Sequence, residues 1–273
     1  MITPYLTPKV SIGMPIYNGE QFICDALDSL LAQTYSNFEL IISDNASTDK
    51  TEQICRSYAS RDKRIRYIKQ QQNKGAPYNF QFVLNEAIGE YFMWAAADDR
   101  RHERFLELST TVLEEDKTTN LVFSDMKTLN LLTGESSISS IGHIINKKKH
   151  WKYLFRLLNE CPSFIYGLHR TQELKKIEVG KYDFFDVHLS HHYEMNSNIK
   201  VIPLVLYTAG TNGNRIPYSL TDDHINPKTF LRNEWSLLKT NISTPVALLL
   251  YILALYIYKK QTAKINNTLH KNQ

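Results

Sequence analysis

Apolar residues in the first half of the chain follow two alternating patterns. Short apolar runs bounded by turn residues are typical of buried strands, whereas apolar residues recurring every three or four positions indicate a helix buried on one face. The runs predict strands at 10–14, 38–43, 91–95 and 121–124, and alternating apolar and polar residues predict a further strand at 64–68. The amphipathic segments predict helices at about 19–31, 51–58, 80–88 and 103–115. This alternation predicts an α/β fold with a mostly parallel central sheet flanked by helices.

Three residues mark where these elements should begin or end. Pro15 lacks the backbone N–H that a central strand donates, so we expect the first strand to end before it. Asp49, followed by Glu52 three residues later, resembles a capping box at the start of a helix. Gly89 is expected to end the helix at 80–88.

The second half of the chain is less regular. It predicts amphipathic helices at about 151–158 and 186–193 and a strand at 201–207. Residues 246–258 form an almost uninterrupted apolar run, shorter than the roughly 20 residues that a helix needs to span a bilayer. A core helix, an oligomer interface and a helix lying on a membrane all fit this run. The basic residues Lys259 and Lys260 beside it favour an anionic membrane surface.

These patterns divide the chain into two regions. We expect an α/β domain at 1–215, with a ligand-binding half at about 8–130 and a second half at 131–215. Residues 216–273 are expected to form a helical extension, for which contact with a membrane is one of the three interpretations of its apolar run.

Composition narrows the class of protein. Hydrophobic residues make up 42% and charged residues 22%, which fits a globular chain. The net charge of +4 is too small to indicate nucleic-acid binding. Cys24, Cys55 and Cys161 are scattered, which argues against a disulfide framework and a zinc site. The N-terminus has no signal-peptide pattern, so we expect a cytoplasmic protein with peripheral contact at the inner face of the membrane.

Polar residues follow three of the predicted strands, at 15–18, 44–49 and 98–99. Each group alone is explained most simply by residues that end strands and cap helices. In open α/β sheets, however, ligands bind beyond the carboxyl ends of the strands, where these groups would meet. Acids that crowd one crevice repel each other and require a cation or a donor-rich ligand. A pair such as Asp98 and Asp99 suits a hard divalent ion that bridges a diphosphate.

The motifs in these loops resemble those of family-2 glycosyltransferases. PIYNGEQFICDALDSLLAQTY followed by FELIISDNASTDKT is similar to the opening of the family, and NKGAPYNFQFVLNEAIGEYFMWAAADD also matches. The likeness covers about 8–130 and continues weakly to about 210 through FIYGLHR and FFD. It implies a GT-A fold and inverting transfer of a sugar from a nucleoside diphosphate sugar of the UDP or dTDP type. The implied acceptor is a hydroxyl of a glycan or lipid-linked molecule in cell-surface polysaccharide synthesis.

The resemblance also implies roles for single residues. A divalent metal, Mg²⁺ or Mn²⁺, is implied at Asp98 and Asp99, and which of the two binds it directly stays open. Ala96 stands where many members carry a further Asp. Asp44 is implied as the acid that recognises the base. The residues implied for the nucleotide are, in chain order, Pro15, Tyr17, Glu20, Asp44, Asn45, Ser47, Asn73, Gly75 and Asn79.

Four residues have less specific assignments. The general base that takes the acceptor proton is implied at Asp186, with Asp183 as the competitor and a helix N-cap as the other interpretation of Asp186. Arg170 would face a phosphate or sugar carboxylate, or lie on the surface. His102 would contact a ligand, or lie in solvent at the start of a helix.

The alternatives are two other enzyme classes and a binding protein without catalytic activity. A sugar nucleotidyltransferase needs a glycine-rich phosphate loop after the first strand, and PIYNGE contains one glycine, which argues against this class. NAD-linked enzymes lack support for the same reason. Ala96 is the one residue that keeps open a further alternative, a nucleotide-sugar-binding protein that has lost catalytic activity.

Overall fold

The computed structural model describes residues 7–140, 142, 164–181, 189, 192–193 and 198–211 of the 273 residues. The expectations for Asp183, Asp186, the apolar run at 246–258 and the extension at 216–273 lie outside these residues. Within the described ranges, no helix is long and apolar enough to cross a membrane.

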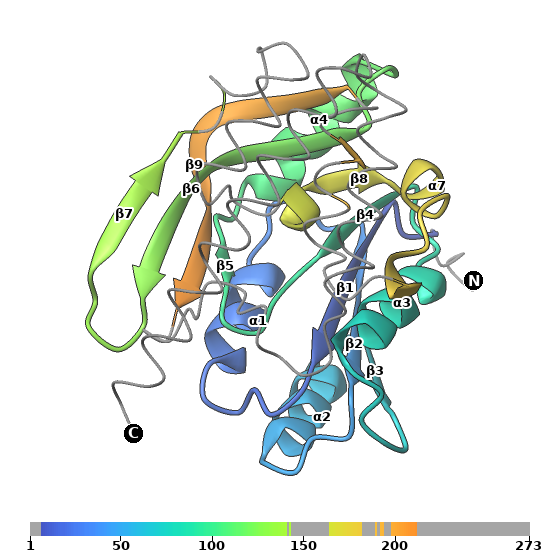
Figure 1. Cartoon of the computed structure of the whole chain (residues 1–273), viewed down its shortest axis with the longest axis vertical. Helices are drawn as coiled ribbons and strands as arrows, with labels where there is room; N and C mark the ends of the chain where they lie inside the picture. The colour runs from blue at the N-terminus through green and yellow to red at the C-terminus, as the bar shows by residue number, and fades with distance from the viewer. Residues whose placement is uncertain are drawn as a thin grey trace, which may run out of the picture.

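Strands from the first half form the parallel part of the sheet (Figure 1). The apolar runs of three of these strands are explained by burial on both faces, which parallel strands require, whereas the edge strand at Ile65–Lys69 is partly exposed. Because all of them run in one direction, their carboxyl ends meet at one edge. In spatial order these strands are β3 (Ile65–Lys69), β2 (Phe38–Asp44), β1 (Val10–Ile16) and β4 (Tyr91–Trp94).

The second half extends the sheet beyond β4 and makes it mixed. In spatial order the added strands are β8 (Leu168–Arg170), β6 (Leu121–Asn130), β9 (Ile199–Thr211) and β5 (Arg100–Arg101), with β7 (Ser136–Ser139) paired to β6. β8 runs antiparallel to both β4 and β6, so β6 runs in the direction of β4, and β9 runs parallel to β6. The carboxyl ends of β6 and β9 therefore lie toward the same edge as those of β1 and β4.

Helices cover both faces of the sheet (Figure 1), which confirms the expected α/β class. The helices are α1 (Ile23–Leu31), α2 (Thr51–Arg61), α3 (Ala76–Glu86), α4 (Phe105–Glu115) and α7 (Thr171–Leu174), with 3₁₀ turns at Phe164–Tyr166 and Val179–Lys181. One apolar layer joins α1, α2 and α4 to β1 and β2, and a second joins α3 to the opposite face.

Strand β1 continues through Pro15, which corrects the expectation that it ends before the proline. The carbonyl of Gly13 accepts a hydrogen bond from Ala95 on the β4 side, and that of Ile16 accepts one from Asn45 on the β2 side. Because backbone groups alternate between the two sides, the nitrogen of Pro15 faces β4. The β1–β4 register ends at Gly13, so this position has no ladder hydrogen bond to donate.

Helix α3 begins four residues before its predicted start. Gly75 adopts φ 83° and ψ 165° at its N-terminus, and Pro77 occupies the first turn, where its missing N–H costs no helical hydrogen bond. The helix ends at Glu86, ahead of Gly89. Gly89 is instead required by close packing, because a Cβ there would lie 2.6 Å from the backbone nitrogen of Ser11.

Candidate active site

Hydrogen bonds join the loop after β1 to the loop after β2. The backbone nitrogen of Asn18 donates to Ser47 Oγ at 2.9 Å, and that of Thr48 donates to Asn18 Oδ1 at 2.8 Å. The backbone nitrogen of Gly19 donates to Thr51 Oγ1 at 2.8 Å. The two loops therefore form one continuous surface at the carboxyl edge of the sheet.

Glu20 and Asp49 fix the start of α2 together. The backbone nitrogens of Glu20 and Thr51 donate to the two oxygens of Asp49, each at 3.0 Å. The backbone nitrogen of Lys50 donates to Glu20 Oε2 at 2.9 Å. Asp49 thus satisfies a helical N–H as expected. Glu52, the expected second member of the capping box, forms ion pairs with basic side chains instead. The reciprocal bond comes from Glu20 in the other loop.

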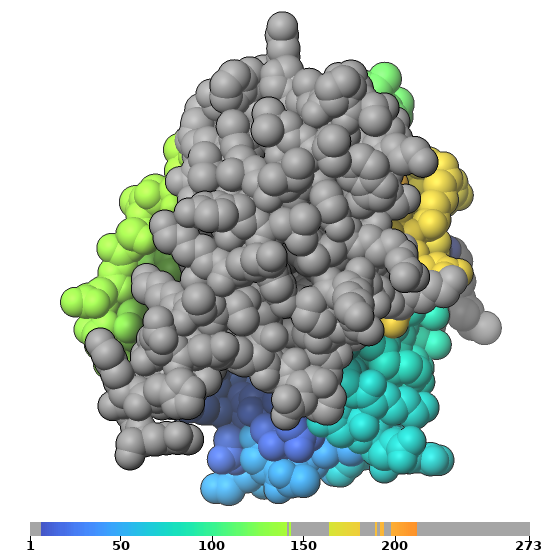
Figure 2. Space-filling model, in the orientation of Figure 1, coloured from blue at the N-terminus to red at the C-terminus, as the bar shows by residue number. Residues whose placement is uncertain are grey.

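The segment between β3 and α3 is attached to the same edge. Nδ2 of Asn45 donates to Asn73 Oδ1 at 2.7 Å and to the Gly75 carbonyl at 3.2 Å, and the backbone nitrogen of Lys74 donates to Asn45 Oδ1 at 3.0 Å. Asn79, buried at the start of α3, donates to the backbone of β2 at 2.8 Å. Figure 2 shows these N-terminal segments, blue to teal, next to one another at the lower edge of the molecule.

Asp44 lies beneath these loops and is fully buried. Its Oδ1 accepts from the backbone nitrogen of Ser47 at 2.7 Å, and its Oδ2 accepts from the Tyr67 hydroxyl at 2.6 Å. Burial and the neighbouring Asp44 raise the pKa of Tyr67 well above its usual range, so the hydroxyl keeps its proton and donates it. Asp44 therefore organises the loop, and its contact with a base stays a prediction. Tyr17, in the loop after β1, is 49% exposed.

The acidic pair follows β4 to this edge. Pairing between β1 and β4 continues through the bond from the Ala95 nitrogen to the Gly13 carbonyl, at 2.9 Å. A Cβ added to Gly19 would lie 3.3 Å from the Cβ of Ala97, so the chain directly before the acidic pair packs against the first loop. Loops from β1, β2 and β4 are thus neighbours, as the sequence predicts.

Asp99 is 7% exposed and is held by strand β9. Its Oδ2 accepts from the Tyr207 hydroxyl at 2.6 Å, and its Oδ1 accepts from the backbone nitrogen of Gly210 at 3.1 Å. Burial and the charge of Asp98 raise the pKa of Asp99 to about 6, while Arg101 acts in the opposite direction. Asp98 is half-buried.

The donor set fits a hard divalent cation. Two adjacent carboxylates whose proximity raises a pKa gain from a positive charge between or beside them. Within the described ranges, no three His, Cys, Asp or Glu side chains gather into a metal site. A carboxylate pair is nevertheless sufficient for Mg²⁺-type binding, in which diphosphate oxygens and waters complete the coordination.

Arg101 is a buried cation that sequence reasoning did not select. Its guanidinium carbon lies 3.9 Å from the centroid of the Tyr207 ring, and Nη2 donates to the Tyr166 carbonyl at 2.9 Å. Its Nε and Nη1 have no hydrogen-bond partner in the part of the chain that the structure describes. Arg101 thus places a positive charge beside the Tyr207–Asp99 contact.

Comparison with known proteins decides the family. The model described as "Glycosyl transferase family 2" matches residues 11–170, which is more than half of the chain. The chain belongs to glycosyl transferase family 2.

Two relatives illustrate how far the family likeness extends. "Putative glycosyltransferase EpsE" of Bacillus subtilis is 37% identical over 120 residues, which cover 44% of this chain and 43% of the relative. "Uncharacterized glycosyltransferase RT0329" of Rickettsia typhi is 31% identical over 192 residues, covering 69% of this chain and 58% of the relative. The matched part of the chain thus spans about half the length of these relatives.

Solved structures share the fold of this family-2 chain. TarS of S. aureus in complex with UDP gives a TM-score of 0.65 at 17% identity, covering 97% of this chain and 92% of TarS. TarS with UDP-GlcNAc gives 0.65 at 19% identity, covering 92% and 72%. The mannosyltransferase PcManGT of Pyrobaculum calidifontis, in complex with GDP-Man and Mn²⁺, gives 0.55 at 16% identity, covering 96% and 80%. These likenesses confirm the expected GT-A fold.

The structure places Arg170 away from the loops of the candidate active site. In the register of β8 and β4 it lies opposite Tyr91, the first residue of β4, and therefore at the other edge of the sheet. Its guanidinium donates to backbone carbonyls at the end of α4 and beyond, those of Leu113, Asp116 and Thr119, at 2.5, 3.2 and 2.8 Å. Arg170 caps the C-terminus of a helix here.

His102 lies in solvent next to the start of α4. Its Nδ1 accepts from the backbone nitrogen of Arg104 at 3.2 Å, and its own backbone nitrogen donates to the Leu206 carbonyl of β9 at 2.9 Å. These contacts match the second of its two interpretations, an exposed residue at a helix start.

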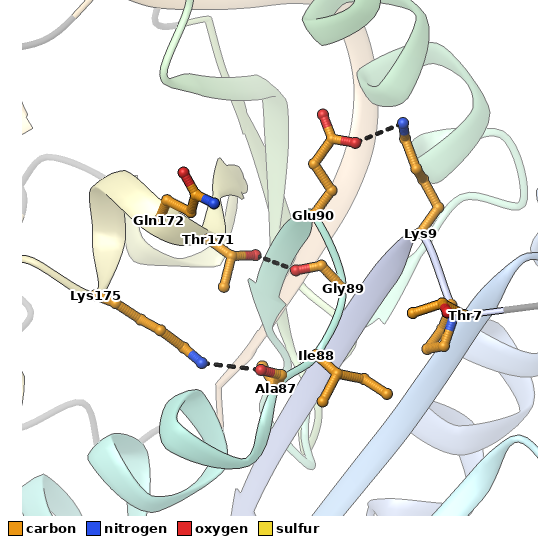
Figure 3. Close-up of a pocket in the computed structure, with 10 residues that line it drawn as sticks. Thr7, Lys9, Ala87, Ile88, Gly89, Glu90, Thr171, Gln172 and Lys175 are labelled. Carbon is orange, nitrogen blue, oxygen red and sulfur yellow. Dashed lines mark hydrogen bonds and ion pairs between the residues drawn. The ribbon is translucent and has the colours of Figure 1, made fainter.

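A pocket of about 460 Å³ lies at the opposite edge of the sheet, where β1 and β4 begin (Figure 3). Its polar groups bind one another: Lys9 pairs with Glu90 at 2.6 Å, and Thr171 and Lys175 donate to carbonyls of the segment before β4 at 2.7 and 2.9 Å. The pocket is separate from the loops of the candidate active site and we assign no ligand to it.

Proposed function

We propose that this chain transfers a sugar, with inversion, from a nucleoside diphosphate sugar of the UDP or dTDP type to a hydroxyl group. One observation supports this most strongly. The loops after β1 and β2 are joined by hydrogen bonds of 2.8–2.9 Å, and the segment before Asp98 and Asp99 packs against the first of them. A nucleotide lying on these loops would extend its diphosphate toward the acidic pair.

The chain's own groups would bind the donor in two places. The half-exposed ring of Tyr17 and the backbone of the joined loops would frame the base and ribose, as the family resemblance implies. Asp98 and Asp99 would hold Mg²⁺ or Mn²⁺, which when bound neutralises the departing diphosphate and orients it. The complexes of TarS with UDP and UDP-GlcNAc, and of PcManGT with GDP-Man and Mn²⁺, support a nucleoside diphosphate sugar and a divalent metal.

The transfer itself requires a base opposite the leaving group. The acceptor oxygen forms a bond to the anomeric carbon while the bond from that carbon to the diphosphate oxygen breaks, and the nucleoside diphosphate leaves. The acceptor proton moves to a carboxylate, which we assign to Asp186, with Asp183 as the competitor. A single displacement of this kind inverts the anomeric centre.

A donor assay with matched variants tests the proposal. Hydrolysis and transfer are measured for UDP- and dTDP-sugars with Mn²⁺, with Mg²⁺ and with EDTA, for the parent, Asp98→Asn and Asp99→Asn. Glu173→Gln is the control, because it removes a partly exposed carboxylate of α7, which lies at the other edge. We expect metal-dependent turnover in the parent and the control and none in the Asp variants. Equal turnover in all four chains would refute the metal assignment.

The same assay separates an enzyme from a binding protein. Ala96, in place of the Asp that many family members carry, is the observation that favours a chain that binds nucleotide sugars without turning them over. Such a chain would bind UDP in the presence of Mn²⁺ but show no metal-dependent hydrolysis or transfer in any of the variants.

Acceptor and location form the last part of the proposal. We propose a glycan or lipid-linked acceptor, reached at the inner face of a membrane on which residues 246–258 lie. The apolar sequence of this run and the lysines that follow it support this position. A chain that ends at Asn241 should lose its membrane-bound fraction in a vesicle sedimentation assay, and an unchanged fraction would contradict the membrane contact.

A further inference from the structure

The two buried acids of the candidate site share one arrangement. In Asp44 and in Asp99, one carboxylate oxygen accepts from a backbone nitrogen and the other accepts from a tyrosine hydroxyl at 2.6 Å. The hydroxyl belongs to Tyr67 in the first case and to Tyr207 in the second. Neither tyrosine lies in a loop, and neither belongs to a motif of the family resemblance.

Tyr67 reaches Asp44 from the neighbouring strand. The β2–β3 register places Tyr67 beside Ile42, two residues before Asp44, so that the long side chain extends along the sheet to the carboxylate. The guanidinium carbon of Arg56, in α2, lies 4.9 Å from the centroid of the Tyr67 ring. The ring is thus held between a helix and the sheet while its hydroxyl fixes the acid.

Tyr207 reaches Asp99 from β9, a strand of the second half. Its side chain is 3% exposed, and the guanidinium of Arg101 lies 3.9 Å from the centroid of its ring. The backbone nitrogen of Gly210, in the same strand, binds the other carboxylate oxygen. A Cβ on Gly210 would lie 2.0 Å from the Asp98 carbonyl, so β9 packs directly against the acidic pair.

We propose that Tyr67 and Tyr207 are positioning residues of the transferase site, each acting through one acid. Tyr67 sets Asp44 for the nucleotide base, and Tyr207 sets Asp99 for the divalent metal. This inference rests on the proposed function. Its physical basis is that a buried carboxylate that loses a hydrogen-bond donor rotates toward another donor, which moves its free lone pairs away from the ligand.

A third tyrosine provides the matched control. The hydroxyl of Tyr91 donates to Glu114 Oε1 at 2.8 Å, at the edge of the sheet opposite the loops. Tyr91→Phe therefore removes a bond of the same kind from the same sheet. A purely structural role predicts similar effects of Phe at all three positions.

The experiment measures two affinities in the full chain. Binding of Mn²⁺ is followed by the electron paramagnetic resonance signal of the free ion, and binding of UDP and GDP is followed by calorimetry at saturating Mn²⁺. The chains are the parent, Tyr67→Phe, Tyr207→Phe and Tyr91→Phe, with thermal midpoints recorded for each.

The expected result separates the two tyrosines. Tyr207→Phe weakens Mn²⁺ binding by about 10- to 100-fold, the range typical of groups that orient metal ligands, and keeps the preference between UDP and GDP. Tyr67→Phe weakens binding of the preferred nucleotide and reduces that preference, and it leaves Mn²⁺ affinity unchanged. Tyr91→Phe leaves all of these affinities within about twofold of the parent, as expected for a site far from the ligand.

Several results would overturn the inference. If Tyr67→Phe and Tyr207→Phe bind like Tyr91→Phe while the parent binds Mn²⁺ and a nucleotide, the inference fails and the proposed function stands. If the parent binds neither, both fail. Should Tyr207→Phe not fold, it is combined with Asp99→Asn, which removes the unpaired charge. Mn²⁺ affinity equal to that of Asp99→Asn alone supports action through Asp99, and a further loss contradicts it.

Discussion

Gly75 is the position where backbone strain should affect ligand binding most directly. Its φ of 83° and ψ of 165° lie in a region that is almost restricted to glycine. A Cβ there would meet nothing closer than Pro77 Cδ at 3.9 Å, an ordinary contact. The cost of Gly75→Ala is therefore backbone strain alone, about 1–3 kcal/mol.

This strain predicts two measurable losses. The two losses share the same strain energy of about 1–3 kcal/mol. Strain that stays in the free protein lowers the thermal midpoint by about 2–4 °C per kcal/mol, and thus by at most roughly 12 °C. Strain that the free protein relieves by breaking the bonds between Asn45, Asn73 and Gly75 is restored when the nucleotide binds. At tenfold per 1.4 kcal/mol, this part lowers UDP affinity in the presence of Mn²⁺ by up to about 150-fold.

Gly134→Ala is the control for this prediction. Gly134 has φ 77° and open space around its Cβ position, but it lies in the β6–β7 hairpin, away from the loops. We expect its thermal midpoint to fall while UDP affinity, measured by calorimetry, stays at the parent value. Equal UDP affinity in Gly75→Ala and Gly134→Ala would refute the claim that the segment at Gly75 contacts the nucleotide.

Three further predictions concern the base, the loop anchor and the core. Asp186→Asn should leave UDP affinity unchanged and lower the single-turnover rate of transfer, and a parent-like rate would exclude Asp186 as the base. Asp49→Ala removes the acceptor of two backbone N–H groups and should lower the free energy of unfolding in urea by about 1–2 kcal/mol, together with UDP affinity. Burial lowers the pKa of His169 to about 4, so the unfolded chain, with an ordinary pKa near 6.5, binds a proton that the folded chain does not. Through His169 the free energy of unfolding should fall by up to about 3 kcal/mol as the pH falls from about 6.5 to about 4. Asp99, with its pKa raised to about 6, acts in the opposite direction over this range, so the effect of His169 is measured as the difference between the parent and His169→Phe. This difference should change by up to about 3 kcal/mol between about pH 6.5 and about pH 4, and an equal pH dependence in parent and variant would contradict the prediction.

The first half of the fold can be predicted from the sequence because the spacing of apolar residues in each element reflects which of its faces are buried. Strands β1, β2 and β4 are apolar runs covered on both faces, and their order along the chain makes their ends meet at one edge. Strands β5 and β8 have two and three residues, too few to carry any periodicity, and they form only because neighbouring strands pair with them. The identity of Pro15 does not reveal which side of the strand its nitrogen faces, and that side decides whether the strand can contain a proline.

The candidate site also has one part that the sequence predicts and one part that it does not. Its loops are local in sequence, so strand ends and polar residues predict them. The partners of its buried acids are not local: Tyr207 and Asp99 are 108 positions apart, and Tyr67 and Asp44 are 23 apart. No motif spacing reveals such contacts before the strands are paired. The position of Arg170 depends on the antiparallel register of β8, which its sequence neighbours do not specify.

The central claim is that a divalent cation at Asp98 and Asp99 joins the nucleotide to the loops of β1 and β2. The most direct measurement is UDP binding by calorimetry with Mn²⁺ and with EDTA, for the parent and for a chain carrying Asp98→Asn and Asp99→Asn. Mn²⁺ should raise UDP affinity at least about tenfold in the parent, corresponding to about 1.4 kcal/mol of coupling, and not in the variant. UDP affinity in the parent that is the same with Mn²⁺ and with EDTA would contradict the account.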